Sequence, residues 1–175
     1  MKPIKQLGPT PPQPAREDVI VFVVGGFKFA IAAGVVKEIR GMDDLHAFTL
    51  GGISAQISKL KYTLERNGTT HFVIDAAQHF QLPPSHASRV MVLRNAPIGV
   101  LVDSTDRIME ISSLHGLPRA FTHEERGWYR GLAVVNGSVI PVVNHNAFLN
   151  RSELEVLRAG LERVRGVVTG GVVTV

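Results

Sequence analysis

Residues 62–74, YTLERNGTTHFVI, and residues 131–143, GLAVVNGSVIPVV, decide the fold predicted for this chain. Each stretch holds an Asn-Gly pair, Asn67-Gly68 or Asn136-Gly137, between flanks that suit β-strands. Asn-Gly is the strongest short hairpin signal, because both residues readily adopt the positive φ angles of a two-residue turn. The two stretches therefore predict two β-hairpins of the same kind.

The spacing between these hairpins is part of a wider internal repeat. Shifting the chain by 69 residues superposes the two Asn-Gly pairs and places Val73 on Val142 without a gap. Apolar blocks and turn signals keep the same register from about residue 20 to about residue 150. We therefore expect two copies of one small fold, over residues 19–84 and 88–150.

Each copy also begins with a predicted hairpin. In the first copy a β-branched run, Val19–Val24, is followed by Gly25-Gly26, and Phe27, Phe29 and Ile31 then alternate with polar or small residues. A period of two is expected where one face of a sheet is buried. The second copy repeats this as strands 90–93 and 98–102, with a turn near Asn95.

Four or five short strands per copy indicate two small five-stranded β-barrels, since closure removes exposed strand edges. Pro141 is expected at an edge or an irregular position, because proline cannot donate to a strand ladder. After the barrels, Ser152 with Glu153 resembles a helix start, and leucines recur at helical spacing until Gly166. We predict a helix over residues 151–166.

The two ends differ from the rest of the chain. Residues 1–18 hold five prolines and no apolar run, which predicts a flexible tail without a signal or membrane-spanning segment. Residues 167–175 form an apolar, glycine-punctuated tail that could add a strand, lie disordered or be peripheral. We expect a cytoplasmic protein with no direct membrane insertion.

Composition excludes several chemistries. The absence of cysteine rules out disulfides, thiolate metal sites and cysteine nucleophiles. No nucleophile elbow, P-loop or dinucleotide fingerprint occurs. His71, Asp75 and His79 could converge on a metal, but the second copy has Asn144 in place of Asp75, and no metal-binding spacing is present. We predict no cofactor, no metal and no catalytic residues.

A nucleic-acid-binding barrel is the alternative reading, because small barrels often stack bases on exposed aromatic residues. The net charge of +4 is modest, and aromatic residues make up only 6% of the chain. Phe22, Phe27, Phe29 and Phe72 occur in strand patterns, where a core position is the better expectation. We therefore expect no nucleic-acid partner.

Three stretches carry a family resemblance. Residues 27–43, FKFAIAAGVVKEIRGMD, contain an aromatic strand followed by V-x-E-I-R-G, and 98–108 and 130–143 supply an I-G-x-L-V-D strand and a closing hairpin. In this order they resemble the CheW family of bacterial chemotaxis coupling proteins. The resemblance implies two SH3-like β-barrel subdomains and a non-catalytic signalling adaptor. It also implies two partners: the homologous regulatory domain of a CheA-type histidine kinase and the tip of a methyl-accepting chemoreceptor.

One stretch departs from the family pattern. The family's N-L-R-G segment falls on residues 65–68, where Gly68 agrees but Asn67 replaces the arginine. Asparagine cannot make the bidentate, charge-assisted contacts of a guanidinium. Either the contact differs here or the neighbouring Arg66 makes it.

The matched positions give the candidate partner-binding residues. We hypothesise that an inter-barrel groove for the receptor is bordered by Val36, Ile39, Thr105 and Ile108, with the alternative that these residues fill the barrel cores. Charged side chains beside the strands suit a polar rim that sets partner choice, with ordinary surface charge as the alternative. This second group, with the turn residues that complete the candidate set, comprises Glu38, Arg40, Gly41, Arg66, Asn67, Gly68 and Asp103.

Overall fold

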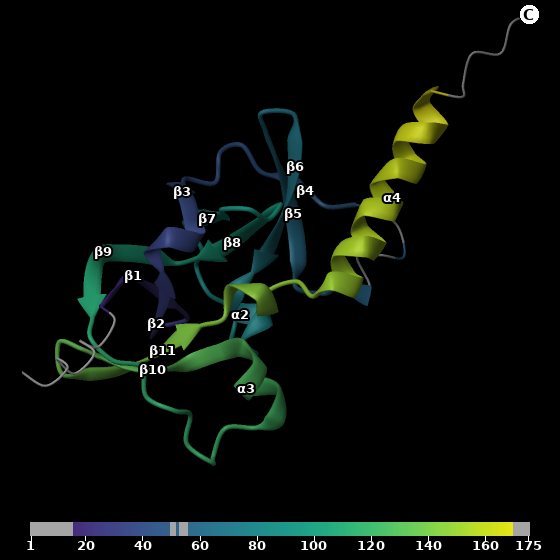
Figure 1. Ribbon diagram of the computed structural model, residues 1–175. Coiled ribbons are helices and arrows are strands. Elements are labelled where there is room, and N and C mark those ends of the chain that lie inside the picture. The colour runs from purple at the N-terminus through teal and green to yellow at the C-terminus, as the bar shows by residue number, and fades with distance from the viewer. Residues whose placement is uncertain (1–15, 50–51, 53–55, 170–175) are drawn as a thin grey trace, which may run out of the picture.

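The computed structural model describes residues 16–49, 52 and 56–169 of the 175-residue chain, and its strands form two sheets (Figure 1). Sheet A has five strands in the order β10 (Tyr129–Val135), β11 (Ser138–Val143), β2 (Phe27–Ala32), β1 (Glu17–Val24) and β9 (Ser104–Ile111). Sheet B has six, in the order β3 (Val36–Arg40), β7 (Arg89–Leu93), β8 (Ile98–Val102), β6 (Thr69–Asp75), β5 (Leu60–Arg66) and β4 (His46–Ala47). The prediction of a mainly β chain is confirmed.

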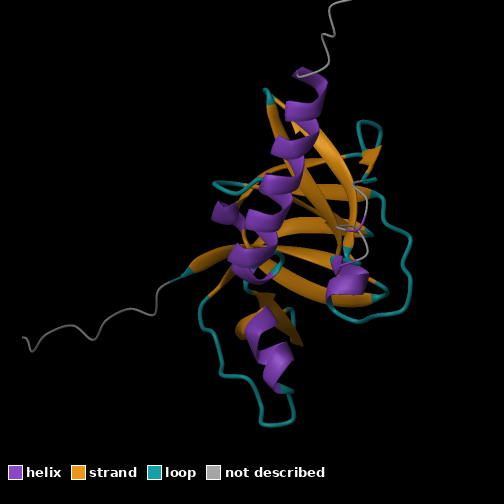
Figure 2. Ribbon diagram, turned by 90° about the vertical axis from the view of Figure 1, so that its right-hand side faces the viewer, coloured by secondary structure: helices purple, strands orange, loops and turns teal. Residues whose placement is uncertain are grey.

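Helical segments connect or follow the strands: η1 (Ala33–Val35), α2 (Ala76–His79), α3 (His123–Trp128), η2 (His145–Ala147) and α4 (Arg151–Thr169). The predicted C-terminal helix is confirmed, and it continues past the expected end at residue 166. Its cap is Asn150, not Ser152: Glu153 N donates to Asn150 Oδ1 and Asn150 N donates to Glu153 Oε2, each at 2.8 Å. Figure 2 shows α4 as the longest helix, alongside the strands.

The predicted hairpin turns are present where the sequence places them. Both residues of each Gly25-Gly26, Asn67-Gly68 and Asn136-Gly137 pair have φ between 49° and 83°. Two successive positive φ angles are the signature of the turn that matches strand twist. Asn95 also has a positive φ, of 61°, in the β7–β8 connection.

The 69-residue repeat holds in three dimensions. Leu64 faces His71 across β5–β6, as Ala133 faces Ile140 across β10–β11. The parallel pairing of β6 with β8 likewise corresponds to that of β11 with β2. The two copies therefore share strand order and register.

The copies exchange their first hairpins, which corrects the predicted division of the chain. Strands β1 and β2 of the first copy pair with β9 and β11 of the second, in sheet A, while β7 and β8 lie in sheet B with β3 and β6. The expected boundary between residues 84 and 88 thus does not separate the sheets. The β1–β2 hairpin is apolar on both faces, so it is buried only when covered from both sides.

Three clusters of buried apolar residues hold the sheets. One lies within sheet A and includes Val21 and Val142, and one lies within sheet B and includes Leu64 and Val92. The largest lies between the two sheets and includes Leu157 of α4, which is fully buried. Much of each sheet is buried on both faces, and this explains why the sequences of the strands are nearly continuous apolar runs.

Two details differ from the sequence expectation. Within the described residues neither strand order closes on itself, so the subdomains are curled sheets of five and six strands. Pro141 lies in β11, an inner strand of sheet A and not an edge, but the ladder between β11 and β2 is only one residue pair long, Val142 with Ala30. A short ladder needs few donors, which is why proline is tolerated there.

The ends of the chain are described only in part. Strand β1 begins at Glu17, inside the segment 1–18 predicted as a tail, and α4 covers residues 167–169 of the predicted apolar tail. Residues 1–15 and 170–175 lie outside the described residues. None of the helices in the described part of the chain combines the length and apolar character needed to cross a membrane.

Candidate partner-binding surfaces

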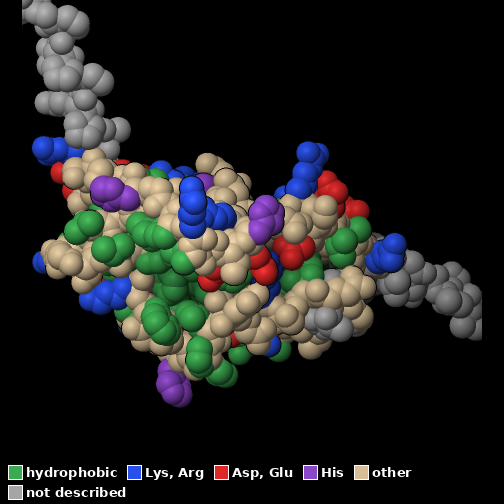
Figure 3. All heavy atoms as spheres, turned by 90° about the horizontal axis from the view of Figure 1, so that it is seen from below, with side chains coloured by type: hydrophobic (Ala, Val, Ile, Leu, Met, Phe, Trp, Pro, Cys, Tyr) green, Lys and Arg blue, Asp and Glu red, His purple; other side chains and the backbone are tan. Residues whose placement is uncertain are grey.

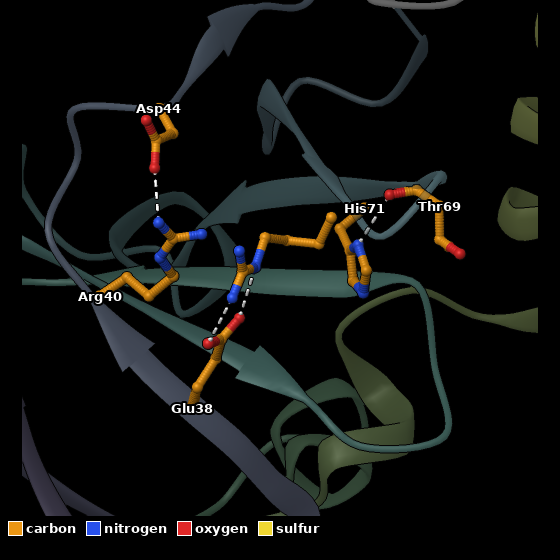
Figure 4. Close-up of polar contacts among 6 residues, drawn as sticks. Glu38, Arg40, Asp44, Thr69 and His71 are labelled. Carbon is orange, nitrogen blue, oxygen red and sulfur yellow. Dashed lines mark hydrogen bonds and ion pairs between the residues drawn. The ribbon is translucent and has the colours of Figure 1, made fainter.

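A bidentate ion pair joins two of the predicted site residues. Arg66 donates from Nε to Glu38 Oε1 at 3.0 Å and from Nη2 to Glu38 Oε2 at 3.1 Å. Glu38 lies on β3 at one edge of sheet B, and Arg66 ends β5 near the other edge. The curl of the sheet brings these two edges together, and the dashed contacts to Glu38 are drawn in Figure 4.

This contact places a guanidinium beside the departure at Asn67. Asn67, with a φ of 50°, lies in the turn, and Arg66 one residue earlier pairs with Glu38. That Arg66 takes the part of the family arginine stays a prediction. The hydrogen bonds from Arg66 lower the pKa of the Glu38 carboxyl, and those same bonds raise the pKa of Arg66. Both side chains are partly exposed. The pair is therefore a solvent-accessible, oriented charge feature, suited to recognition more than to stability.

We predict that the pair is coupled only while Glu38 is ionised. In a double-mutant cycle with Glu38→Gln and Arg66→Gln, urea unfolding at neutral pH and low salt should show a favourable coupling energy. Because the folded pKa of Glu38 is lowered, this coupling is present above the ordinary carboxyl value of 4.5 and disappears as pH falls through the lowered value. A coupling that persists in acid, or none at neutral pH, would contradict the geometry.

The neighbouring residues of β3 have different surroundings. Arg40 donates to Asp44 Oδ2 at 2.5 Å, so its charge is directed along the loop that follows β3 (Figure 4). At Gly41 an added Cβ would approach Asp43 Oδ2 at 3.4 Å, an ordinary contact. Nothing in the structure requires glycine at position 41.

Val36 is not a surface residue. Its side chain is 7% exposed and belongs to the large cluster between the sheets, which supports the core alternative and not the groove hypothesis. Ile39, on the same strand, is 39% exposed. The register of β3 against β7 shifts between Val36 and Glu38, and such a bulge changes which side chains face inward.

The remaining predicted residues lie on another part of the molecule. Asp103 Oδ2 accepts a hydrogen bond from Gly25 N at 2.8 Å, so Asp103 ties the β8–β9 corner to the β1–β2 turn. Thr105 and Ile108 lie on β9, an edge strand of sheet A, where Ile108 is 61% exposed. Among the described residues, no hydrogen bond or ion pair joins these three to the Glu38–Arg66 pair.

Sequence reasoning missed an apolar surface on sheet A. Val134 pairs with Val139 across β10–β11, and Phe27 begins β2, the strand on the other side of β11. These three side chains, which we call the apolar row, are 56%, 64% and 57% exposed. Figure 3, which views the molecule from below, shows hydrophobic side chains gathered on this side. The exposure of Phe27 contradicts its expected core position: Phe27 begins β2 directly after the Gly25-Gly26 turn, where Gly26 is exposed as well.

The sequence of the β10–β11 hairpin does not by itself predict which of its side chains are exposed. In VVNGSVIPVV both faces of the hairpin carry valine or isoleucine, so alternation alone does not distinguish the outer face. Comparison of the copies does distinguish the hairpins: the positions of Val134 and Val139 correspond to Glu65 and Thr70 in the first copy. Only one of the two equivalent hairpins therefore presents an apolar outer face.

The histidines considered for a metal have other contacts. Asp75 Oδ1 accepts from Ala77 N at 2.9 Å, which caps α2, and His71 Nδ1 lies 3.2 Å from Thr69 O. His79 is buried among aromatic rings, and this burial lowers its pKa to about 3. Within the described residues no group of three His, Asp or Glu side chains could hold a metal ion.

The aromatic residues do not form a base-stacking platform. Phe22, Phe29 and Phe72 are buried in the core, as expected. Phe27 is the exposed phenylalanine of the apolar row, and no aromatic ring pair among the described residues includes it. Base stacking on nucleic-acid-binding barrels relies on several exposed aromatic side chains, and Phe27 is the one phenylalanine among the large exposed apolar residues of the described chain.

Comparison with known proteins agrees with the geometry. Residues 18–153 match the family model described as the CheW-like domain. The chain is similar to the crystal structure of the scaffolding protein TtCheW from Thermoanaerobacter tengcongensis, with a TM-score of 0.65 and 16% identity over 78% of this chain and 95% of that chain. No curated protein sequence matches. The structural likeness shows the fold, so the predicted arrangement of two SH3-like subdomains is confirmed.

Proposed function

Because the chain belongs to the CheW-like domain family, we propose that it is a non-catalytic cytoplasmic adaptor that couples a chemoreceptor to a CheA-type histidine kinase. The observation that carries the proposal is the apolar row Phe27–Val139–Val134 on an otherwise folded, two-sheet domain. An adaptor acts through the free energy of association, so it needs surfaces that stay apolar and accessible in the free protein.

We assign the apolar row to the kinase. Its three side chains project from adjacent strands of a rigid sheet, so little conformational entropy is lost when a flat partner surface covers them. A regulatory domain built from similar small barrels would offer such a surface. The Glu38–Arg66 pair on sheet B, at the other subdomain, then supplies an oriented charge feature for a second contact, with the receptor tip as its partner.

Val139→Asp should weaken kinase binding without unfolding the protein. Val139 is 64% exposed, so its loss costs little folding free energy, whereas a charge in the centre of an apolar interface should weaken binding by about 2 kcal/mol or more. The measurement is isothermal titration of the full chain with the purified regulatory domain of the cognate kinase, with thermal unfolding recorded for the same samples.

Val156→Asp is the matched control. Val156 is an exposed valine on α4, away from sheet A, and this variant should bind the kinase domain as the wild type does. If Val139→Asp binds the kinase domain as tightly as the wild type does, the apolar row is not part of the kinase contact. Equal weakening by both substitutions would show a nonspecific effect of added negative charge and would count against the row as well.

A further inference from the structure

A hollow lies between the C-terminal helix and one end of sheet B. Its walls are the tip of the β5–β6 hairpin, the β7–β8 connection and α4, with a volume of about 340 Å³. A second hollow of about 250 Å³ shares Thr69, Pro97 and Arg158 with it. The backbone of this region is well braced, because Phe72 N donates to Pro97 O at 2.8 Å and the hairpin turn is a tight two-residue one.

The lining is cationic. Lys37, Arg66 and Arg158 line the first hollow together with His71, and no aspartate or glutamate of the described chain lines either hollow. Neither Lys37 nor Arg158 takes part in an ion pair within the described residues. Arg66 uses Nε and Nη2 for Glu38, which leaves its Nη1 donors for another group. Converging positive charges of this kind favour an anion.

Part of the lining is apolar. Leu93 and Pro97 line the first hollow, and Phe72 and Leu161 line the adjoining hollow. A bare inorganic anion would leave this surface uncovered. The combination fits a ligand in which a carboxylate or phosphate is attached to an apolar group.

We propose that the hollow between α4, the β5–β6 turn and the β7–β8 connection is a binding site for such an anion, with Lys37, Arg66 and Arg158 as its charged contacts. The site does not include the apolar row, and it shares Arg66 with the proposed receptor contact. Residues of sheet B and its turns, from both copies, form it with α4, and α4 follows the second copy and occurs once. The two subdomains therefore differ in two features: the apolar row lies on sheet A, and the proposed ligand site lies between sheet B and α4.

Nuclear magnetic resonance titration of the full chain with phenyl phosphate, benzoate and benzyl alcohol tests the proposal. Saturable shifts of the backbone amides of Thr69, Asn95 and their neighbours are expected with an anionic probe and not with the neutral alcohol. Tighter binding of phenyl phosphate would identify a phosphorylated ligand, and tighter binding of benzoate a carboxylate. No saturable shift with either anion, or equal binding of benzyl alcohol, would overturn the proposal.

Charge-reversal variants provide the control. Lys37→Glu combined with Arg158→Glu should weaken anion binding roughly tenfold or more, because two attractive charges become repulsive. Arg163→Glu changes the charge of the same helix at an exposed residue outside the lining, and it should leave the affinity within about twofold. Equal affinities of the double variant and the wild type would contradict the assignment, whatever the outcome for kinase binding.

Discussion

Val36→Asp is expected to lose about 4 kcal/mol or more of folding free energy. Val36 is 7% exposed and packs in the cluster between the two sheets, where a carboxylate would have no partner. Burying an unpaired charge is among the few single changes that cost this much, and the total stability of a domain is about 5–15 kcal/mol. Urea unfolding followed by circular dichroism gives the difference directly.

Ile39→Asp is the companion measurement. Ile39 lies three residues further along the same strand and is 39% exposed, so aspartate there keeps most of its hydration and should cost about 1 kcal/mol or less. If Val36→Asp instead folds as stably as the wild type and fails only to bind a partner, Val36 belongs to a docking surface and the core assignment is wrong.

Acidification from pH 6.5 to pH 5 should cost roughly 2 kcal/mol of folding free energy through His79 alone. Burial lowers the pKa of His79 from 6.5 to about 3, with the charge of Lys59 as the smaller cause. The unfolded chain therefore binds a proton between these values and the folded chain does not, so stability falls by about 1.4 kcal/mol for each pH unit below 6.5. His145, with a pKa lowered by partial burial, acts in the same direction.

The aromatic surroundings explain why His79 stays neutral. Its ring centroid lies 5.0 Å from that of Phe148 and 5.6 Å from that of Trp128, and its Nε2 is buried without a hydrogen-bond partner in the described structure. His79→Leu keeps a similar volume and should remove this part of the pH dependence of unfolding. Proton resonances of the His79 ring supply a readout in the wild type, independent of whether the variant folds. Titration of the ring near pH 6.5 would refute the prediction.

Local structure was predictable because its causes are local. The Asn-Gly and Gly-Gly turns depend on the φ preferences of two residues, so the hairpins occur where the sequence places them. The 69-residue repeat likewise predicted equivalent strands, which the register of β5–β6 and β10–β11 bears out. The C-terminal helix was predictable over 151–166 from its apolar spacing, although it continues to Thr169 and its cap lies at Asn150.

Site residues were harder to assign, because exposure depends on segments far away in the chain. Val36 and Ile39 are both apolar β-strand residues, and only the bulge in β3 and the cover from the other sheet bury one and expose the other. Val134 and Val139 are indistinguishable in sequence from the buried valines beside them. The Glu38–Arg66 contact needed the curl of sheet B, which brings its two edges together.

The sequence by itself determined the hairpins, the duplication, the terminal helix and the absence of cysteine chemistry, since turn preference, periodicity and composition are properties of neighbouring residues. Only the tertiary structure decided that the copies exchange their first hairpins, that one subdomain exposes an apolar row, and that α4 completes a cationic hollow. Those features depend on which faces cover one another. A strand that is apolar on both faces can be buried in more than one arrangement, and the packing of the whole chain selects one.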